Sequence, residues 1–286
     1  MNGAGASAGI GLCSAASWGG SDFVGGMGAR RAPALLIVAS GHIFSFLLLL
    51  GYCLLIRLPL PGTHSLIFAL IGGFEGSIAL AVFYRALSMG AMGITAALTG
   101  LLTALVPVLY SFFTDGLPNP LSACGLAAAL VAICLITLSP PKGAPADDAR
   151  PSSRPALLLA ATAGLMFGTQ LILFKIASPG GVVATMTAGR AAGGLAMVLV
   201  LLVAPPKGPW KGFWGTGIAA GLLDTAGNLF YLRATQIGRL DVAAVVCSLY
   251  PAVTILLAAL VLHERPSGRQ ITGMALALGA VMLLSA

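Results

Sequence analysis

The sequence predicts an all-α polytopic membrane protein, with ten transmembrane helices arranged as two inverted five-helix repeats. Three observations predict this fold. The composition is too poor in charge for a water-facing surface, the chain holds a series of apolar runs of membrane-spanning length, and its two halves resemble each other.

The composition indicates that lipid solvates most of the surface. Of the 286 residues, 58% are hydrophobic and only 8% are charged, and the mean hydropathy is +1.00. A soluble domain carries roughly a quarter charged residues. The net charge of +7 does not indicate a nucleic-acid partner, because the Lys and Arg residues lie mainly in short connections. In such connections they orient spans and meet lipid headgroups.

Apolar runs of about 20 residues are long enough to cross a hydrocarbon core. Ten such segments are predicted, at 8–28, 33–56, 65–88, 91–113, 120–139, 156–177, 182–204, 212–234, 240–262 and 267–285. The stretch 140–155 is rich in Pro, Ala and charge and is predicted to be a flexible linker. It divides the chain into two repeats, 1–139 and 156–286.

The two halves match at a nearly constant offset. With an offset of 148 positions, Tyr84-Arg85-Ala86-Leu87-Ser88-Met89-Gly90 aligns with Leu232-Arg233-Ala234-Thr235-Gln236-Ile237-Gly238. The same offset aligns His42 with Arg190 and Gly125 with Gly273, and an offset of 149 aligns Trp18-Gly19 with Phe167-Gly168. Because five spans is an odd number, the second copy must enter the membrane from the opposite side. Inverted repeats are typical of transporters, although another duplicated membrane scaffold remains an alternative.

Several motifs carry a family resemblance across nearly the whole chain. They are Trp18-Gly19, Phe83-Tyr84-Arg85-Ala86-Leu87, Phe167-Gly168, Lys175, Arg190, Ser248-Leu249-Tyr250-Pro251-Ala252-Val253-Thr254, His263-Glu264-Arg265-Pro266, Gln270 and Gly273. In these motifs the chain resembles the drug/metabolite transporter superfamily, in particular its ten-span branch with two EamA domains. The resemblance implies secondary transport by alternating access, through a cavity lined mostly by segments 1, 3, 4, 6, 8 and 9. Amino acids, other metabolites, drugs and nucleotide sugars are substrates in this family.

The first repeat departs from the family pattern at three positions. Gly116 stands where the second repeat has Glu264, Pro107 lies one helical turn later than expected, and Asp22 occupies a position that is usually uncharged. These departures leave the fold prediction intact and weaken any specific substrate assignment.

Ionisable residues at bilayer depth are the first site candidates, because each costs at least about 2.5–3.5 kcal/mol to insert. Asp22, Glu75 and Asp224 lie well inside predicted spans, as do His42 and Arg190. Glu75 is the leading candidate for proton coupling or for binding a substrate cation. The alternative is a structural hydrogen bond or ion pair, for instance with His42 or Arg190.

Helical spacing adds further candidates. Asp224, Asn228 and Tyr231 share one helix face, which should line a cavity or make a dry interhelical contact. The predicted substrate-binding or coupling residues are Trp18, Asp22, Glu75, Gln170, Lys175, Asp224, Asn228, Tyr231 and Tyr250. The predicted structural or pairing residues are His42, Arg190, Pro107, Pro251 and Glu264. Pro251 either frees carbonyl groups in mid-membrane or simply kinks its helix.

The predicted function is carriage of a small metabolite, amino acid or xenobiotic, with protons as a candidate coupling ion. We expect no enzymatic activity, cofactor or metal, since no catalytic, nucleotide-binding or zinc motif occurs. The expected location is a bacterial-type inner membrane, as a monomer or homodimer. A lipid-intermediate flippase and a non-transporting assembly or sensor protein are the alternatives. The Lys and Arg distribution favours external termini, whereas the family resemblance favours cytoplasmic ones.

Overall fold

The computed structural model describes residues 3–29, 31–87, 92–137, 154–208, 212–261, 263 and 266–285. Within them the chain is helical and contains no strand. The α-helices are α1 (Gly3–Ala29), α2 (Ala34–Leu55), α3 (Thr63–Leu87), α4 (Met92–Thr114), α5 (Pro120–Thr137), α6 (Arg154–Ala177), α7 (Val182–Val203), α8 (Trp214–Ile237), α9 (Leu240–Cys247), α10 (Tyr250–Val261) and α11 (Gly268–Ser285). The short 3-10 helix η2 (Ser178–Gly180) follows α6.

Within the described residues, each predicted segment contains a helix, and the segment 240–262 contains two. The predicted segment 240–262 forms two helices, α9 and α10, which are separated at Ser248 and Leu249. Pro251 then lies in the first turn of α10, where its missing N–H costs least. The proline therefore starts a new helix after a break, where the sequence had predicted a proline inside one continuous span.

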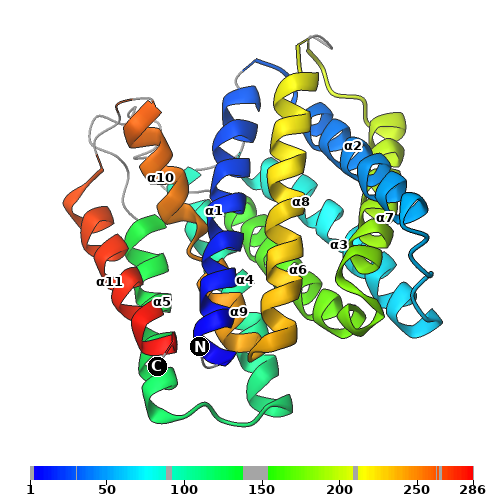
Figure 1. The fold of residues 1–286 in the computed structure, drawn as a ribbon. Coiled ribbons are helices and arrows are strands. Elements are labelled where there is room, and N and C mark those ends of the chain that lie inside the picture. The colour runs from blue at the N-terminus through cyan, green and yellow to red at the C-terminus, as the bar shows by residue number, and fades with distance from the viewer. Residues whose placement is uncertain are drawn as a thin grey trace.

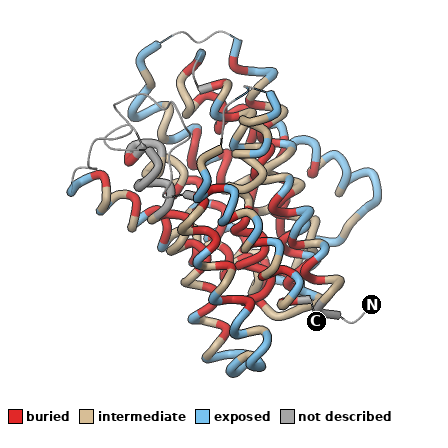
Figure 2. Tube along the Cα trace, turned by 90° about the vertical axis from the view of Figure 1, so that its left-hand side faces the viewer, coloured by how far each residue is buried: buried red, intermediate tan, exposed pale blue. Residues whose placement is uncertain are grey.

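The helices have the length and composition of membrane spans. Five stretches among the described residues are long and apolar enough to cross a bilayer: Ala34–Leu55, Thr63–Phe83, Arg154–Gly180, Val182–Val203 and Leu240–Val261. Shorter apolar helices cover Leu98–Thr114, Pro120–Ile136 and Gly268–Leu284. Figure 2 shows exposed residues along the outer helices, and many of the exposed residues have large apolar side chains. With these spans and this apolar surface, the chain is an integral multi-pass membrane protein.

The most extensive helix pairings are α1 with α8, α3 with α6 and α5 with α11. Figure 1 shows α1 and α8 side by side in the centre of the bundle and α5 beside α11 at one edge, with both chain ends at the same end of the bundle. The pairings come in sets that correspond between the halves. The pair α1–α8 corresponds to α6–α3, and α2–α8 corresponds to α7–α3.

Glycines let these helices approach closely, and the contacts repeat at an offset of 148 positions. A Cβ atom built on Gly221 of α8 would lie 2.3 Å from the Cα of Gly41 in α2. At the corresponding positions, a Cβ atom on Gly73 of α3 would lie 2.1 Å from the carbonyl oxygen of Gly189 in α7. Only glycine permits backbone contact this close.

The α5–α11 pair shows the same correspondence. Gly125 of α5 packs against Leu284 of α11, and Gly273 of α11 packs against Ile136 of α5. Gly125 and Gly273 are 148 positions apart in the sequence, as are Ile136 and Leu284. The sequence similarity between the halves therefore coincides with a similarity in their contacts.

Candidate functional site

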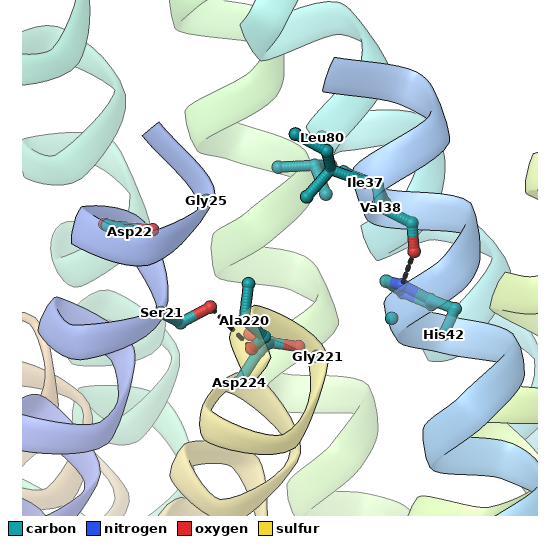
Figure 3. A pocket seen from close by; sticks show the side chains of 11 residues that line it. Ser21, Asp22, Gly25, Ile37, Val38, His42, Leu80, Ala220, Gly221 and Asp224 are labelled. Carbon is teal, nitrogen blue, oxygen red and sulfur yellow. Dashed lines mark hydrogen bonds between the residues drawn. The ribbon is translucent and has the colours of Figure 1, made fainter. Parts of the chain in front are cut away.

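A pocket of about 70 Å³ lies between helices from both halves of the chain. Its walls come from α1, α2 and α3 in the first half and from α8 in the second (Figure 3). Ser21, Asp22, His42 and Asp224 supply its polar lining, and Ile37, Val38 and Leu80 are among its apolar lining residues. A cavity needs roughly 10–15 Å³ of such volume to hold one water. The pocket therefore has room for several waters or for one small chemical group.

Arg190 of α7 joins α2 and α8 behind this pocket. Its Nη2 donates to Oδ2 of Asp224 in a salt bridge, and its Nη1 donates to Nε2 of His42 over 3.1 Å. Arg190 is only 4% exposed. The buried cation is therefore paired with a carboxylate that lines the pocket, as a charge at bilayer depth requires.

The partners of His42 determine its protonation state. Its Nδ1–H donates to the carbonyl oxygen of Val38 over 3.1 Å, one helical turn earlier (Figure 3). Since an arginine side chain can only donate, Nε2 must act as the acceptor for Arg190. His42 is therefore neutral in this arrangement, with its proton on Nδ1.

Asn228 supports the Asp224 carboxylate from one turn further along α8. Its Nδ2 donates to the carbonyl oxygen of Asp224 over 2.8 Å and to Oδ1 over 3.3 Å. Asp224 thus has a partner for each carboxylate oxygen. The Nε atom of Arg190 is buried and has no hydrogen-bond partner in the described part of the chain.

Asp22 of α1 is the second carboxylate that lines the pocket. It is exposed and lies within electrostatic reach of Asp224 and of the Tyr250 hydroxyl. Among the described residues it makes no salt bridge or hydrogen bond. Its neighbour Ser21 donates its hydroxyl proton to the carbonyl oxygen of Ala220 over 2.9 Å. Asp22 therefore brings to the pocket a carboxyl group that has no partner among the described residues.

An aromatic cluster lies on the same side of α1, one turn before Asp22. The ring of Trp18 lies 6.0 Å from that of Tyr231 and 6.3 Å from that of Tyr250, in an edge-on geometry. Tyr231 is fully buried, and its hydroxyl donates to the carbonyl oxygen of Leu171 over 2.8 Å. On the predicted stripe of α8, Asp224 thus lines the pocket, while Tyr231 makes an interhelical contact away from it.

The remaining predicted residues lie outside the pocket. Glu75 is half-buried on α3 and interacts with the Thr169 hydroxyl of α6, so the carboxylate partner of Arg190 is Asp224 and not Glu75. The Gln170 side chain packs against Gly76. Lys175 donates to the carbonyl oxygen of Thr235 at the end of α8.

The predicted structural prolines and Glu264 complete the set. Pro107 lies inside α4, which continues through it, whereas Pro251 begins α10. Glu264 is outside the described residues. The sequence interpretation missed the small-residue wall of the pocket formed by Gly25, Gly41, Ala220 and Gly221. The abundance of glycine in α1 and α8 was its only signal.

A second polar cluster, also absent from the sequence predictions, ties the two halves together at one end of the bundle. Arg239, between α8 and α9, donates to the carbonyl oxygens of Asp115 over 3.0 Å and Gly116 over 2.7 Å. It also makes a salt bridge of 2.9 Å with the buried Asp241. The hydrogen bond to Asp241 raises the pKa of Arg239, so this connection stays cationic.

The fold and the pocket together define a polytopic helical membrane protein with a polar site between its halves. Residues 154–286 match the EamA-like transporter family. The crystal structure of a protein that is 17% identical in sequence aligns with this chain with a TM-score of 0.76. The alignment covers 97% of this chain and 96% of the other. No curated protein matches the chain. The family match confirms the resemblance to EamA-domain transporters over residues 154–286, and the similarity to the solved structure concerns the fold of the whole chain.

Proposed function

We propose that this protein is a secondary transporter that carries a small metabolite, amino acid or xenobiotic across a membrane by alternating access. One observation carries the proposal: a pocket lies between helices of both halves, and one of its lining carboxyl groups, that of Asp22, has no partner among the described residues. The Arg190 network joins the same halves through α2, α7 and α8. A movement of one half against the other would therefore change access to the pocket without dismantling either half.

We propose further that the halves are inverted five-helix repeats, residues 1–139 and 156–286, joined by the linker 140–155. The correspondence of Gly41–Gly221 with Gly189–Gly73 contacts supports this topology, as does the corresponding set of helix pairings. His42 and Arg190 occupy equivalent positions and bond to each other. Equivalent residues meet in this way when they lie near a pseudo-two-fold axis.

Proton coupling is the proposed energy source, with Glu75 as the candidate carrier of the proton. Glu75 lies between α3 and α6, which are among the most extensively paired helices of the two halves, and its one identified neighbour is the neutral Thr169 hydroxyl. Glu75→Gln should abolish pH-driven uptake and leave the melting temperature unchanged. Uptake with the wild-type pH dependence in this variant would discard Glu75 as the coupling residue.

The transport proposal is tested by reconstitution. Purified protein in proteoliposomes should accumulate at least one compound from a panel of amino acids, other metabolites and drugs, and a pH gradient should change the rate. The control is the Arg190→Ala variant, which removes the link between α2, α7 and α8 and should lose uptake. A panel that gives no flux above empty liposomes in either direction would contradict the proposal.

The two alternative functions make different demands on the interior. A lipid-intermediate flippase needs an opening between helices toward the bilayer. A non-transporting assembly or sensor protein needs a dry interior with its charges paired, and the paired Asp224 meets that demand. The pocket and the unpartnered Asp22 favour transport. For the transporter we propose a bacterial-type inner membrane and a monomeric or homodimeric state.

A further inference from the structure

We propose that the pocket binds the ammonium group of a small organic amine and that Asp22 is its carboxylate partner. This inference rests on the proposed transport function and names the substrate class of the same site. It follows from the charges that face the pocket, from the shape of its walls, and from what occupies the equivalent position in the other half.

Among the described residues, the ionisable groups that face the pocket leave one carboxyl group, that of Asp22, without a partner. α8 contributes Asp224, whose carboxylate is paired with Arg190 of α7. α2 contributes His42, which accepts a hydrogen bond from Arg190 and is therefore neutral. α3 contributes Leu80, an apolar residue, and α1 contributes Asp22. Among the described lining residues, Asp22 is the charge that a bound cation would balance.

An anionic substrate does not fit this arrangement. Arg190 is the cation that pairs with Asp224, but it is 4% exposed and is absent from the pocket lining. Binding a carboxylate or phosphate would bring a further negative charge beside Asp22 and Asp224. Like charges this close repel strongly in a medium of low dielectric constant, so the pocket selects against anions.

The equivalent position in the other half is filled. Trp18-Gly19 of α1 aligns with Phe167-Gly168 of α6 at an offset of 149 positions, so the buried, apolar Leu171 corresponds to Asp22. At the offset of 148 positions that relates α3 to α8, Gly76 corresponds to Asp224. A Cβ atom on Gly76 would lie 2.1 Å from Nε2 of Gln170, so the neutral Gln170 amide occupies the space beside Gly76. The Asp22 half has two carboxylates and a pocket at these positions. The difference concentrates negative charge on one side of the molecule.

The walls restrict the rest of the ligand. Ile37, Val38 and Leu80 are apolar, and the pocket of about 70 Å³ holds one small group. A primary ammonium group fits beside Asp22, with a short hydrocarbon tail against the apolar wall. Such an amine is protonated at neutral pH, as a lysine side chain is.

The test compares three ligands of nearly equal size and different charge: n-butylamine, n-butanol and butyrate. Thermal unfolding of the purified full-length protein at pH 7 should shift upward with butylamine and not with equal concentrations of butanol or butyrate. Asp22→Asn should weaken butylamine binding by about tenfold or more, and Asp22→Glu should retain it. Asp115→Asn, at the distant α4–α5 connection, is the matched control and should bind as the wild type does.

Equal stabilisation by butylamine and butanol, or none by any ligand, would overturn the proposal, as would full binding by a folded Asp22→Asn variant. If that variant does not fold, the ligand series on the wild type and on Asp22→Glu decides. Uptake of the compound panel is measured separately. Uptake without selective amine binding would refute the amine site alone, whereas Asp22-dependent binding without any flux would refute transport alone.

Discussion

Arg190 shows how a charge is accommodated at bilayer depth in this protein. Its guanidinium reaches Asp224 on α8 and His42 on α2 at once, which a compact lysine ammonium would do less well. The residue is almost fully buried, so each of these contacts replaces water that the guanidinium has lost. The network therefore organises the pocket walls and gives the Asp224 carboxylate its partners.

The Arg190–Asp224 pair can be tested by a double-mutant cycle. Asp224→Asn leaves the buried guanidinium without its anion and should lower the unfolding free energy by about 1–3 kcal/mol. Arg190→Gln should have a similar cost. Because both changes remove the same interaction, the double variant should lose clearly less than the sum, as measured by denaturation in detergent. Additive losses would show that the two side chains do not interact.

The sequence was a good guide to the residues that form the polar site and a poorer guide to the partners of those residues. The insertion cost alone identified Asp22, Asp224 and Arg190 as needing partners, water or a function. An ion pair with Arg190 was one alternative role for Glu75, yet the structure pairs Arg190 with Asp224. Partner choice depends on how far each helix is rotated about its axis, and that rotation is decided by packing between helices.

Close contact at glycine residues is the main way in which the helices of this protein pack against one another. The Gly41–Gly221 and Gly73–Gly189 contacts bring α2 against α8 and α3 against α7. Lipid tails are as apolar as the helix surfaces, so the hydrophobic effect does not drive helices together within the membrane. Close van der Waals packing at the glycine contacts must supply the attraction between the helices.

Glycine substitutions should separate close contact from ordinary helix propensity. Gly221→Ala and Gly73→Ala each put a methyl group into the backbone of a neighbouring helix and should lower the melting temperature of the protein. Gly51→Ala in α2 meets nothing within 4 Å and should be neutral or slightly stabilising, by up to about 1 kcal/mol. If all three variants melt alike, α2 does not pack closely against α8, nor α3 against α7.

The Arg239 cluster predicts a second effect at the scale of elements. Arg239→Lys should lose the forked contact to the Asp115 and Gly116 carbonyls, so hydrogen exchange should accelerate in residues 111–119. Arg233→Lys is the matched control, because Arg233 is exposed on α8 and bonds only to Gln236 among the described residues. Equal exchange in the two variants would mean that Arg239 does not hold the α4–α5 connection.

Element boundaries were predictable because apolar runs and Pro- or Gly-rich connections alternate along the chain. The break between α9 and α10 was not predicted, since the run 240–262 is apolar throughout and Pro251 is equally compatible with a kink. Leu249 and Ala252 bond back only three residues, which ends one helix and starts the next. A break in the helix backbone of this kind does not change the hydropathy of the sequence, so hydropathy cannot predict it.

At the scale of the whole molecule, the account depends on two similar halves that share a polar pocket. The halves were visible in the sequence as matches at a nearly constant offset. The pocket was not, because its walls are glycines, alanines and aliphatic residues whose meeting depends on tertiary packing. Alternating access further requires that this pocket be reached from each side of the membrane in turn.

Access to the pocket from both sides is the most direct test of that claim. Ser21→Cys, in a background with the five native cysteines replaced, gives a pocket-lining thiol. A membrane-impermeant maleimide should label it from either face in oriented vesicles, whereas Asn119→Cys, on the exposed α4–α5 connection, should be labelled from one face only. Labelling of Ser21→Cys from a single face under every substrate and pH condition would contradict alternating access.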